Sequence, residues 1–152
     1  MKKKVTCILM IAVTVVTVMA GCHQDAEENL RKNLKPGTYT GQSQTASEED
    51  GGGYAVVKLT VGNDNNIESI IFDTYDKNGK KRFSDNGSVN VPQYATDEEA
   101  ELLGDIGEAC MLYKEQFIET KDAEQLDAVS GATLSYEQFK EAVDIALQKA
   151  SE

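Results

Sequence analysis

Alternation of apolar and polar residues predicts two adjacent β-strands. Residues 54–61 (YAVVKLTV) alternate and are rich in β-branched side chains, and residues 67–75 (IESIIFDTY) show the same pattern. The turn-forming residues 62–66 (GNDNN) separate them, so we expect an antiparallel hairpin. Residues 37–44 (GTYTGQSQ) predict a further strand, and the acidic, glycine-rich residues 45–53 predict a flexible connection.

Two later segments have apolar residues at helical spacing. In the first, Thr96 is followed by three acidic residues (DEE), which predicts an N-cap and a first turn stabilised by the helix dipole. Its apolar stripe contains Leu102, Leu103, Ile106, Ala109, Cys110, Tyr113 and Phe117. In the second, the spacing Ser135-x-x-Gln138 predicts a capping box and a helix from about residue 136 to residue 150.

These elements predict an α+β fold in a single domain, with an antiparallel β-sheet packed against amphipathic helices. Residues 76–92 are polar and predict a surface loop with a turn at Asn78-Gly79. The spacing from Asp76 is faintly similar to a calcium loop, but Thr74 stands at the first ligand position, so no metal site is predicted.

The first 21 residues predict an export signal. Three lysines precede an uncharged run at residues 5–20, which is too short and too weakly apolar for a membrane span. The run ends in Met-Ala-Gly-Cys, which resembles a bacterial lipobox and predicts lipidation of Cys22. The alternative is an ordinary signal peptide followed by a chance cysteine.

With this leader, we expect the chain to have three parts. We expect a lipoprotein signal peptide at residues 1–21, a polar membrane tether at residues 22–36, and a folded domain at residues 37–152. Acyl chains on Cys22 would anchor the protein firmly to the extracytoplasmic face of the cell membrane, because each buried CH₂ contributes about 0.8 kcal/mol.

Charge and residue usage exclude several function classes. The chain has 15 basic and 26 acidic residues; three lysines leave with the leader, so 12 basic against 26 acidic residues give a net charge of −14. Such a surface repels nucleic acid. Cys7 lies in the leader, Cys110 is the single thiol expected in the domain, and the only histidine, His23, lies in the tether. A disulfide, a cysteine metal cluster and a Ser-His-Asp or Cys-His centre are therefore not expected, and Cys110 is expected to be buried.

The stretch DAVSGATLS at residues 127–135 has two interpretations. In the structural one, Ser135 caps the last helix, Gly131 adopts a positive φ, Ser130 and Thr133 bond nearby backbone, and Asp127 satisfies loop amides.

The functional interpretation uses the free N–H groups and partial positive charge of a helix N-terminus, which suit a phosphate. Gly131 and Ala132 would let a phosphate ester approach the backbone, and Thr133 would place a hydroxyl beside it. The residues by themselves predict a phosphate-bearing ligand, bound or esterified, without naming it.

The motif Asp-Ala-Val-Ser-Gly-Ala-Thr-x-Ser resembles the flavinylation motif of the FMN-binding domain family. This family includes the FMN-carrying C subunit of the sodium-pumping NADH:quinone reductase, the G subunit of Rnf complexes and small electron-transfer lipoproteins. The resemblance spans about residues 37–150 and includes Gly-x-Tyr-x-Gly at residues 37–41, the hairpin, and YDKNGKKRFSD at residues 75–85.

This resemblance implies a covalent cofactor. Thr133 would carry FMN through a phosphoester, and a separate Mg²⁺-dependent FAD:protein FMN transferase would install it with release of AMP. Asp127 matches the acid that the transferase recognises, and Ser130, Gly131 and Ala132 match the positions that shape the phosphate loop. The flavin ring would stack on one of four tyrosines, Tyr39, Tyr54, Tyr75 or Tyr113.

The resemblance also implies a function. The protein would be a membrane-anchored electron carrier, not itself an enzyme, which accepts electrons from a membrane reductase or quinol and passes them to another flavoprotein or an external acceptor. Two alternatives remain open. One is a sensor or binding lipoprotein that holds FMN or another phosphorylated ligand non-covalently. The other is a surface lipoprotein without a cofactor, which serves adhesion or assembly.

Overall fold

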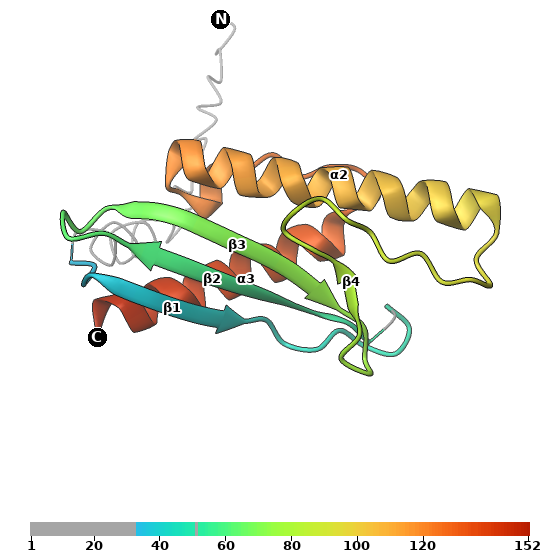
Figure 1. Cartoon of the computed structure of the whole chain (residues 1–152), viewed down its shortest axis with the longest axis horizontal. Coiled ribbons are helices and arrows are strands. Elements are labelled where there is room, and N and C mark those ends of the chain that lie inside the picture. Colours follow the sequence, from blue (N-terminus) through green and yellow to red (C-terminus); the bar gives the residue numbers. More distant parts are fainter. Residues whose placement is uncertain (1–32, 51) are drawn as a thin grey trace, which may run out of the picture.

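A four-stranded antiparallel sheet in the order β1-β2-β3-β4 forms the base of the fold, and two long helices pack on it (Figure 1). The computed structural model describes residues 33–50 and 52–152. The predicted signal peptide (residues 1–21) and the lipidation site Cys22 lie outside the described residues. The α+β fold predicted for the domain is confirmed.

Three strands lie where the alternation predicted them. They are β1 (Gly37–Gln42), β2 (Tyr54–Val61) and β3 (Ile67–Tyr75). The hairpin of β2 and β3 is antiparallel, with Val57 opposite Phe72.

A fourth strand, β4 (Lys81–Phe83), was not predicted, because it lies inside the stretch 76–92 that was expected to be a loop. Three residues of sequence KRF are too short and too charged to give an alternation signal. The strand forms because Lys81 and Phe83 pair with Tyr75 and Thr74 at the end of β3.

The first long helix, α2 (Asp97–Thr120), begins at the predicted N-cap. Glu99 N–H donates to Thr96 Oγ1 at 3.2 Å, and Thr96 N–H donates to the Glu99 carboxylate at 2.7 Å, which completes a capping box. The helix ends at Lys121, whose left-handed backbone (φ 57°) directs its N–H to the Phe117 carbonyl. A one-turn 3-10 helix, η1 (Ala123–Gln125), then leads towards α3 (Thr133–Ser151).

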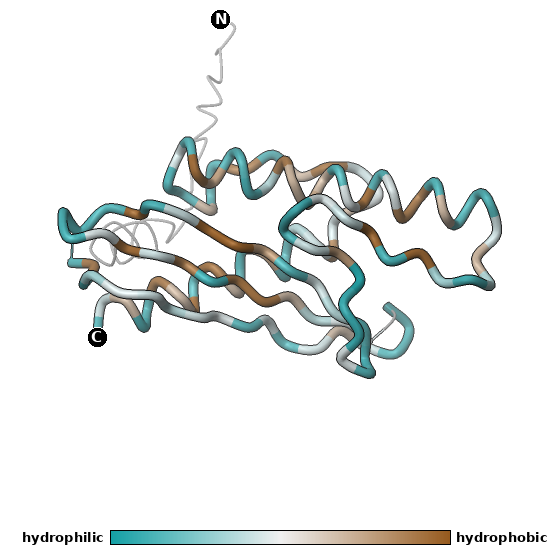
Figure 2. The backbone as a smooth tube through the Cα atoms, viewed as in Figure 1, coloured by the Kyte–Doolittle hydropathy of each residue, from teal (hydrophilic) through white to brown (hydrophobic). Residues whose placement is uncertain are grey.

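Both helices pack against one face of the sheet. The inward residues of β2 are buried and the outward ones are not, and apolar segments run along β2 and β3 while the turns are polar (Figure 2). Aromatic side chains join the layers: Phe72 of β3 lies edge-on to Phe139 of α3, with ring centroids 4.7 Å apart, and Phe117 of α2 contacts the same ring at 6.0 Å. The core is therefore shared by β3, α2 and α3.

Helix α3 approaches β1 so closely that only a glycine fits between them. A Cβ added to Gly41 would lie 1.8 Å from the Ala142 carbonyl oxygen and 2.8 Å from the Ala146 nitrogen. Both contacts are with helix backbone, which cannot rotate away. The alanines on this side of α3 and Gly41 thus set the distance between helix and sheet.

This contact predicts that Gly41→Ala destabilises the protein by about 1–3 kcal/mol or more, because α3 must shift off the sheet. Gly104→Ala is the matched control, since an added Cβ there meets nothing within 4 Å in the middle of α2. We expect that control to stabilise the protein by up to about 1 kcal/mol. Urea unfolding of both variants measures the difference; equal free energies of unfolding would contradict the close contact.

Candidate functional site

Helix α3 begins at Thr133, three residues before the predicted start, and the capping-box prediction is wrong. The N-cap residue is Ala132, whose methyl group cannot accept a hydrogen bond, and no side chain caps the helix. Ser135 lies inside the first turn, where its hydroxyl is hydrogen-bonded to the buried Cys110 thiol. Gln138 is also turned inward, and its side-chain amide donates to the Gly53 carbonyl at 2.7 Å. Both residues predicted to form the capping box therefore bond to partners that are distant in the sequence instead.

The first turn of α3 is consequently open. The earliest helical bond runs from Tyr136 N–H to the Ala132 carbonyl at 3.0 Å. The amides of Thr133, Leu134 and Ser135 have no acceptor in the described part of the chain. Gly131, with φ of +86°, turns the chain into the helix, as the sequence predicted. The result is a cluster of free N–H groups with the partial positive charge of a helix N-terminus.

The loop before α3 is held by a buried hydroxyl of α2. Tyr113 is fully buried; its hydroxyl accepts a hydrogen bond from Val129 N–H at 3.0 Å and donates to the Ala132 carbonyl at 3.4 Å. Burial raises the pKa of Tyr113, so the hydroxyl stays protonated and keeps its donor. Gln116, one turn further along α2, accepts from Asp127 N–H at 2.9 Å. Helix α2 thus fixes the backbone that leads into the open turn.

A cleft of about 260 Å³ lies beside this turn. Its walls come from the first two turns of α3, from α2, from the adjoining ends of β3 and β4 and from Gly53 just before β2, and most of its surface is apolar. The residues that line it include Gly131, Ala132, Leu134, Leu103, Ile106 and Phe83. Its volume is close to the lower end of the range for small-molecule sites, about 300–1,000 Å³.

The predicted site residues are brought together only in part. Gly131 and Ala132 line the cleft, and Thr133 is exposed next to them. Ser130 lines a different, acidic hollow against α2, and Asp127 is exposed.

The structural interpretation of the motif is not supported at these positions. The side chains of Thr133, Ser130 and Asp127 make no hydrogen bond to any described residue, so they neither cap the helix nor satisfy loop amides.

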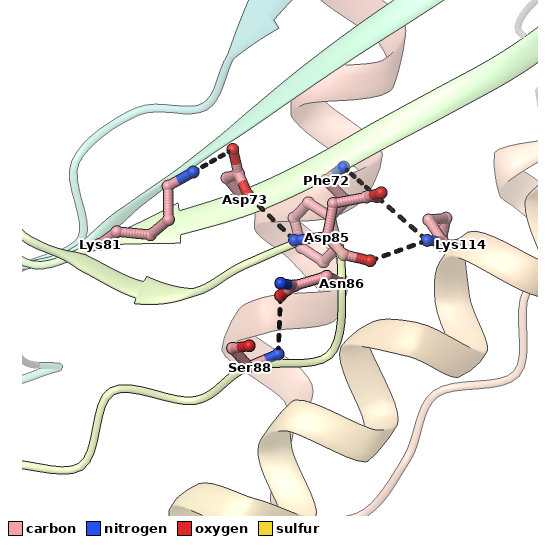
Figure 3. Close-up of polar contacts among 7 residues, drawn as sticks. All are labelled: Phe72, Asp73, Lys81, Asp85, Asn86, Ser88 and Lys114. Atoms are coloured by element: carbon pink, nitrogen blue, oxygen red, sulfur yellow. Dashed lines mark hydrogen bonds and ion pairs between the residues drawn. The ribbon is translucent and has the colours of Figure 1, made fainter.

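The wall opposite α3 is held by a polar network that the sequence did not reveal (Figure 3). The Asp85 carboxylate accepts from Phe72 N–H at 2.9 Å and from Lys114 Nζ of α2 at 3.1 Å. Asp85 N–H in turn donates to Asp73 Oδ1 at 3.0 Å, and the other oxygen of Asp73 pairs with Lys81 at 2.7 Å. Asp85 therefore ties the segment after β4 to both β3 and α2. Its only signal in the sequence was its place at the end of YDKNGKKRFSD.

The four tyrosines predicted as candidates for ring stacking lie in different surroundings. Tyr75 lines the cleft, and its ring stacks on Tyr54 with centroids 5.2 Å apart. Tyr113 is fully buried and has no free face. Tyr39 donates to the Lys35 carbonyl at 3.0 Å, at the end of β1 where the chain enters the sheet.

Residues 33–50 and 52–152 contain neither a metal-binding cluster nor a membrane-spanning helix. No group of three or more His, Cys, Asp or Glu side chains is placed to hold a metal ion. Over the same residues, no helix has the length and apolar character needed to cross a membrane. Asp76, the first residue of the calcium-like spacing, accepts from the backbone N–H groups of Asn78 and Lys80 and so forms the turn before β4.

Removing the Tyr113 hydroxyl should loosen the loop without changing the core. In Tyr113→Phe, Val129 N–H loses its acceptor, so we expect a loss of about 1–3 kcal/mol in the free energy of unfolding and faster hydrogen exchange at Val129. Tyr136→Phe is the control, because the Tyr136 hydroxyl makes one long bond, 3.4 Å, to the Leu126 carbonyl. Exchange at Val129 that rises equally in both variants would contradict the assignment.

Cys110 is buried, as predicted, and burial raises the pKa of its thiol to about 12, partly opposed by the Ser135 hydroxyl. In protein that begins at His23 it is the single cysteine. We expect its reaction with a disulfide reagent at pH 8 to be at least about a hundredfold slower in the folded than in the unfolded protein, and to speed up only as pH approaches 12. A rate at pH 8 that matches the unfolded chain would show that the thiol is accessible.

Comparison with known proteins agrees with the geometry of the open turn and the cleft. A family model described as the FMN-binding domain matches residues 51–148, well over half of the chain. The crystal structure of the CPE2226 protein from Clostridium perfringens has the same fold, with a TM-score of 0.52 and 24% sequence identity over 77% of this chain and 88% of that one. No curated protein matches the chain in sequence. The match includes both the motif at the start of α3 and the cleft beside it, and the chain belongs to the FMN-binding domain family.

Proposed function

We propose that this protein is a membrane-tethered electron carrier whose FMN is joined through its phosphate to the Thr133 hydroxyl. The observation that carries the proposal is the uncapped first turn of α3. An exposed threonine stands at its first position, three amides lack acceptors among the described residues, and an apolar cleft opens beside it. Phosphate groups bind at such helix starts because the free N–H groups and the helix dipole both favour negative charge.

The residues present fit FMN. The amides of Thr133, Leu134 and Ser135 would donate to the phosphate, and Gly131 and Ala132 leave room for it to reach the backbone. The apolar walls of the cleft, with Leu103 and Ile106, would shield a ring system from water. FMN would supply reversible electron uptake, while the protein supplies its position and surroundings.

The attachment would be made by a FAD:protein FMN transferase, and the chain would be its substrate. The Thr133 oxygen would form the new phosphoester and lose its proton, the pyrophosphate bond of FAD would break, and AMP would leave. Asp127 is exposed on the loop before α3, where a second protein can reach it. A covalent link suits a carrier outside the cytoplasm, since a cofactor lost there is not recovered.

The proposed location rests on the leader and its lipobox-like Met-Ala-Gly-Cys, and the proposed partners rest on the family resemblance. Lipid on Cys22 would hold the domain at the extracytoplasmic face of the cell membrane. Electrons would come from a membrane reductase or quinol and leave to another flavoprotein or external acceptor. The domain would not act as an enzyme on a substrate of its own.

The threonyl ester is tested by co-expression with the transferase, followed by denaturation and mass analysis of the peptide that contains residue 133. We expect covalent flavin in the parent protein and in Ser130→Ala, and none in Thr133→Val, which keeps the shape of the side chain but lacks the hydroxyl. Flavin that stays bound in Thr133→Val rules out the assignment, and if Ser130→Ala at the same time loses it, the ester lies on Ser130. Intact FMN released from the parent protein would instead support non-covalent binding.

A further inference from the structure

A basic hollow of about 360 Å³ adjoins the apolar cleft beside α3, which is the proposed cofactor cleft. Its lining includes Lys80, Lys81, Arg82, Asn90 and Tyr94. Arg82 also lines the cofactor cleft, so the two share one residue as a common wall.

Backbone contacts fix the walls of the hollow. Asn90 N–H donates to the Arg82 carbonyl at 2.7 Å, and the Asn90 side-chain amide donates to the Lys81 carbonyl at 3.2 Å. A turn closed by Ala95 N–H and the Pro92 carbonyl, at 3.0 Å, then brings Tyr94 to the rim. The segment after β4 therefore runs back beside that strand and encloses a defined space.

The charge of the hollow is opposite to that of the protein. Four of the 12 basic residues that follow the leader lie within residues 77–82, in a chain of net charge −14 after the leader. Lys77 pairs with Glu48 and Lys81 pairs with Asp73. Lys80 and Arg82 make no ion pair or side-chain hydrogen bond with any described residue. Two cations are thus free to bind an anion.

The one acid in the lining is already engaged. Asp76 accepts backbone N–H groups from Asn78 at 2.8 Å and Lys80 at 2.9 Å. The hydrogen bond from Lys80 N–H is the main cause that lowers the pKa of Asp76 below its ordinary value. Arg82 and Lys80 also attract this carboxylate, but more weakly than the backbone N–H groups, and it forms no ion pair with either side chain among the described residues.

The size and lining of the hollow indicate what it binds. Its volume is roughly ten times the ~30 Å³ that one water molecule occupies in the liquid, which suits an organic molecule better than an inorganic anion. Arg82 offers a planar fork for a carboxylate or phosphate, and the Tyr94 ring, 88% exposed, offers a face for stacking. We propose that the hollow is a binding site for a soluble aromatic anion, a planar ring that carries carboxylate or phosphate groups.

A lipid headgroup is the less suitable source of the anion. The chain enters the domain where Gly37 of β1 pairs with Val61 of β2, and Lys35 N–H bonds the Ala150 carbonyl at the same end. The hollow follows the Tyr54–Tyr75 pair at the opposite end of the sheet, about 25 Å away along β2. The hollow thus lies at the end of the sheet opposite to residues 33–37, where the described chain enters the domain (Figure 1).

The place of the hollow gives the proposed carrier a docking position for a small diffusible partner next to its cofactor. That use rests on the proposed function, whereas the binding of an aromatic anion does not.

The test uses the mature chain in uncharged detergent, with and without flavin, and measures binding of naphthalene-2,6-dicarboxylate by calorimetry. We expect saturable binding to both forms, at least about tenfold weaker in Arg82→Gln and weaker still in Lys80→Gln/Arg82→Gln. Lys58→Gln is the matched control, because it removes one exposed positive charge from β2 and should leave the affinity within about twofold.

Four outcomes would overturn the proposal. Binding to the flavin-free form alone would place the probe in the cofactor cleft, and equal losses in Lys58→Gln would show a general charge effect. Inorganic phosphate that binds as tightly as the dicarboxylate would show a simple anion site. Binding to phosphatidylglycerol vesicles that depends on Arg82, with none to the dicarboxylate, would make a headgroup the occupant. If the parent protein carries no flavin on Thr133 after co-expression with the transferase, the proposed function is refuted, whereas Arg82-dependent binding of the dicarboxylate to that same protein would leave this inference standing.

Discussion

Two adjacent residues of α2 hold both walls of the proposed cofactor cleft. The Tyr113 hydroxyl binds the backbone that leads into α3, and the next residue, Lys114, binds Asp85 behind β4. A buried phenol must find hydrogen-bond partners, and the loop before α3 supplies them through Val129 and Ala132. The two segments that border the cleft are therefore positioned by one rigid helix, and the width of the cleft depends on how α2 lies against the sheet.

The open helix start follows from the same arrangement. Because Ser135 and Gln138 satisfy buried partners at Cys110 and Gly53, neither is available to cap α3. An uncapped first turn ordinarily costs about 1 kcal/mol of helix stability. Here the apolar face of α3 offsets that cost by burial against β1 and β2, which leaves the amides free for a phosphate. The helix is thus stabilised by the burial of its apolar face, and the free amides of its first turn remain available for the proposed phosphate.

The opposite side of the fold shows how a short strand can shape two cavities. β4 is too short to cover the edge of β3, and the Asp85 carboxylate takes the N–H of Phe72 that a longer strand would have bonded. The segment after β4 then doubles back along it through Asn90. This return separates the cofactor cleft from the basic hollow, with Arg82 between them, so a three-residue strand and one carboxylate define both spaces.

The sequence by itself determined the strands β2 and β3, their hairpin and the N-cap of α2, because these depend on periodicity and on residues a few positions apart. The motif at residues 127–135 also indicated an FMN-binding domain, which the family comparison confirms. Only the tertiary structure decided where α3 begins, because the partners of Ser135 and Gln138 are Cys110 of α2 and Gly53 just before β2, far away in the chain. It likewise decided that β4 exists and that Asp85 has a structural role. A strand of three residues forms only by pairing with the edge of β3, and the Asp85 carboxylate is held there by the N–H of Phe72.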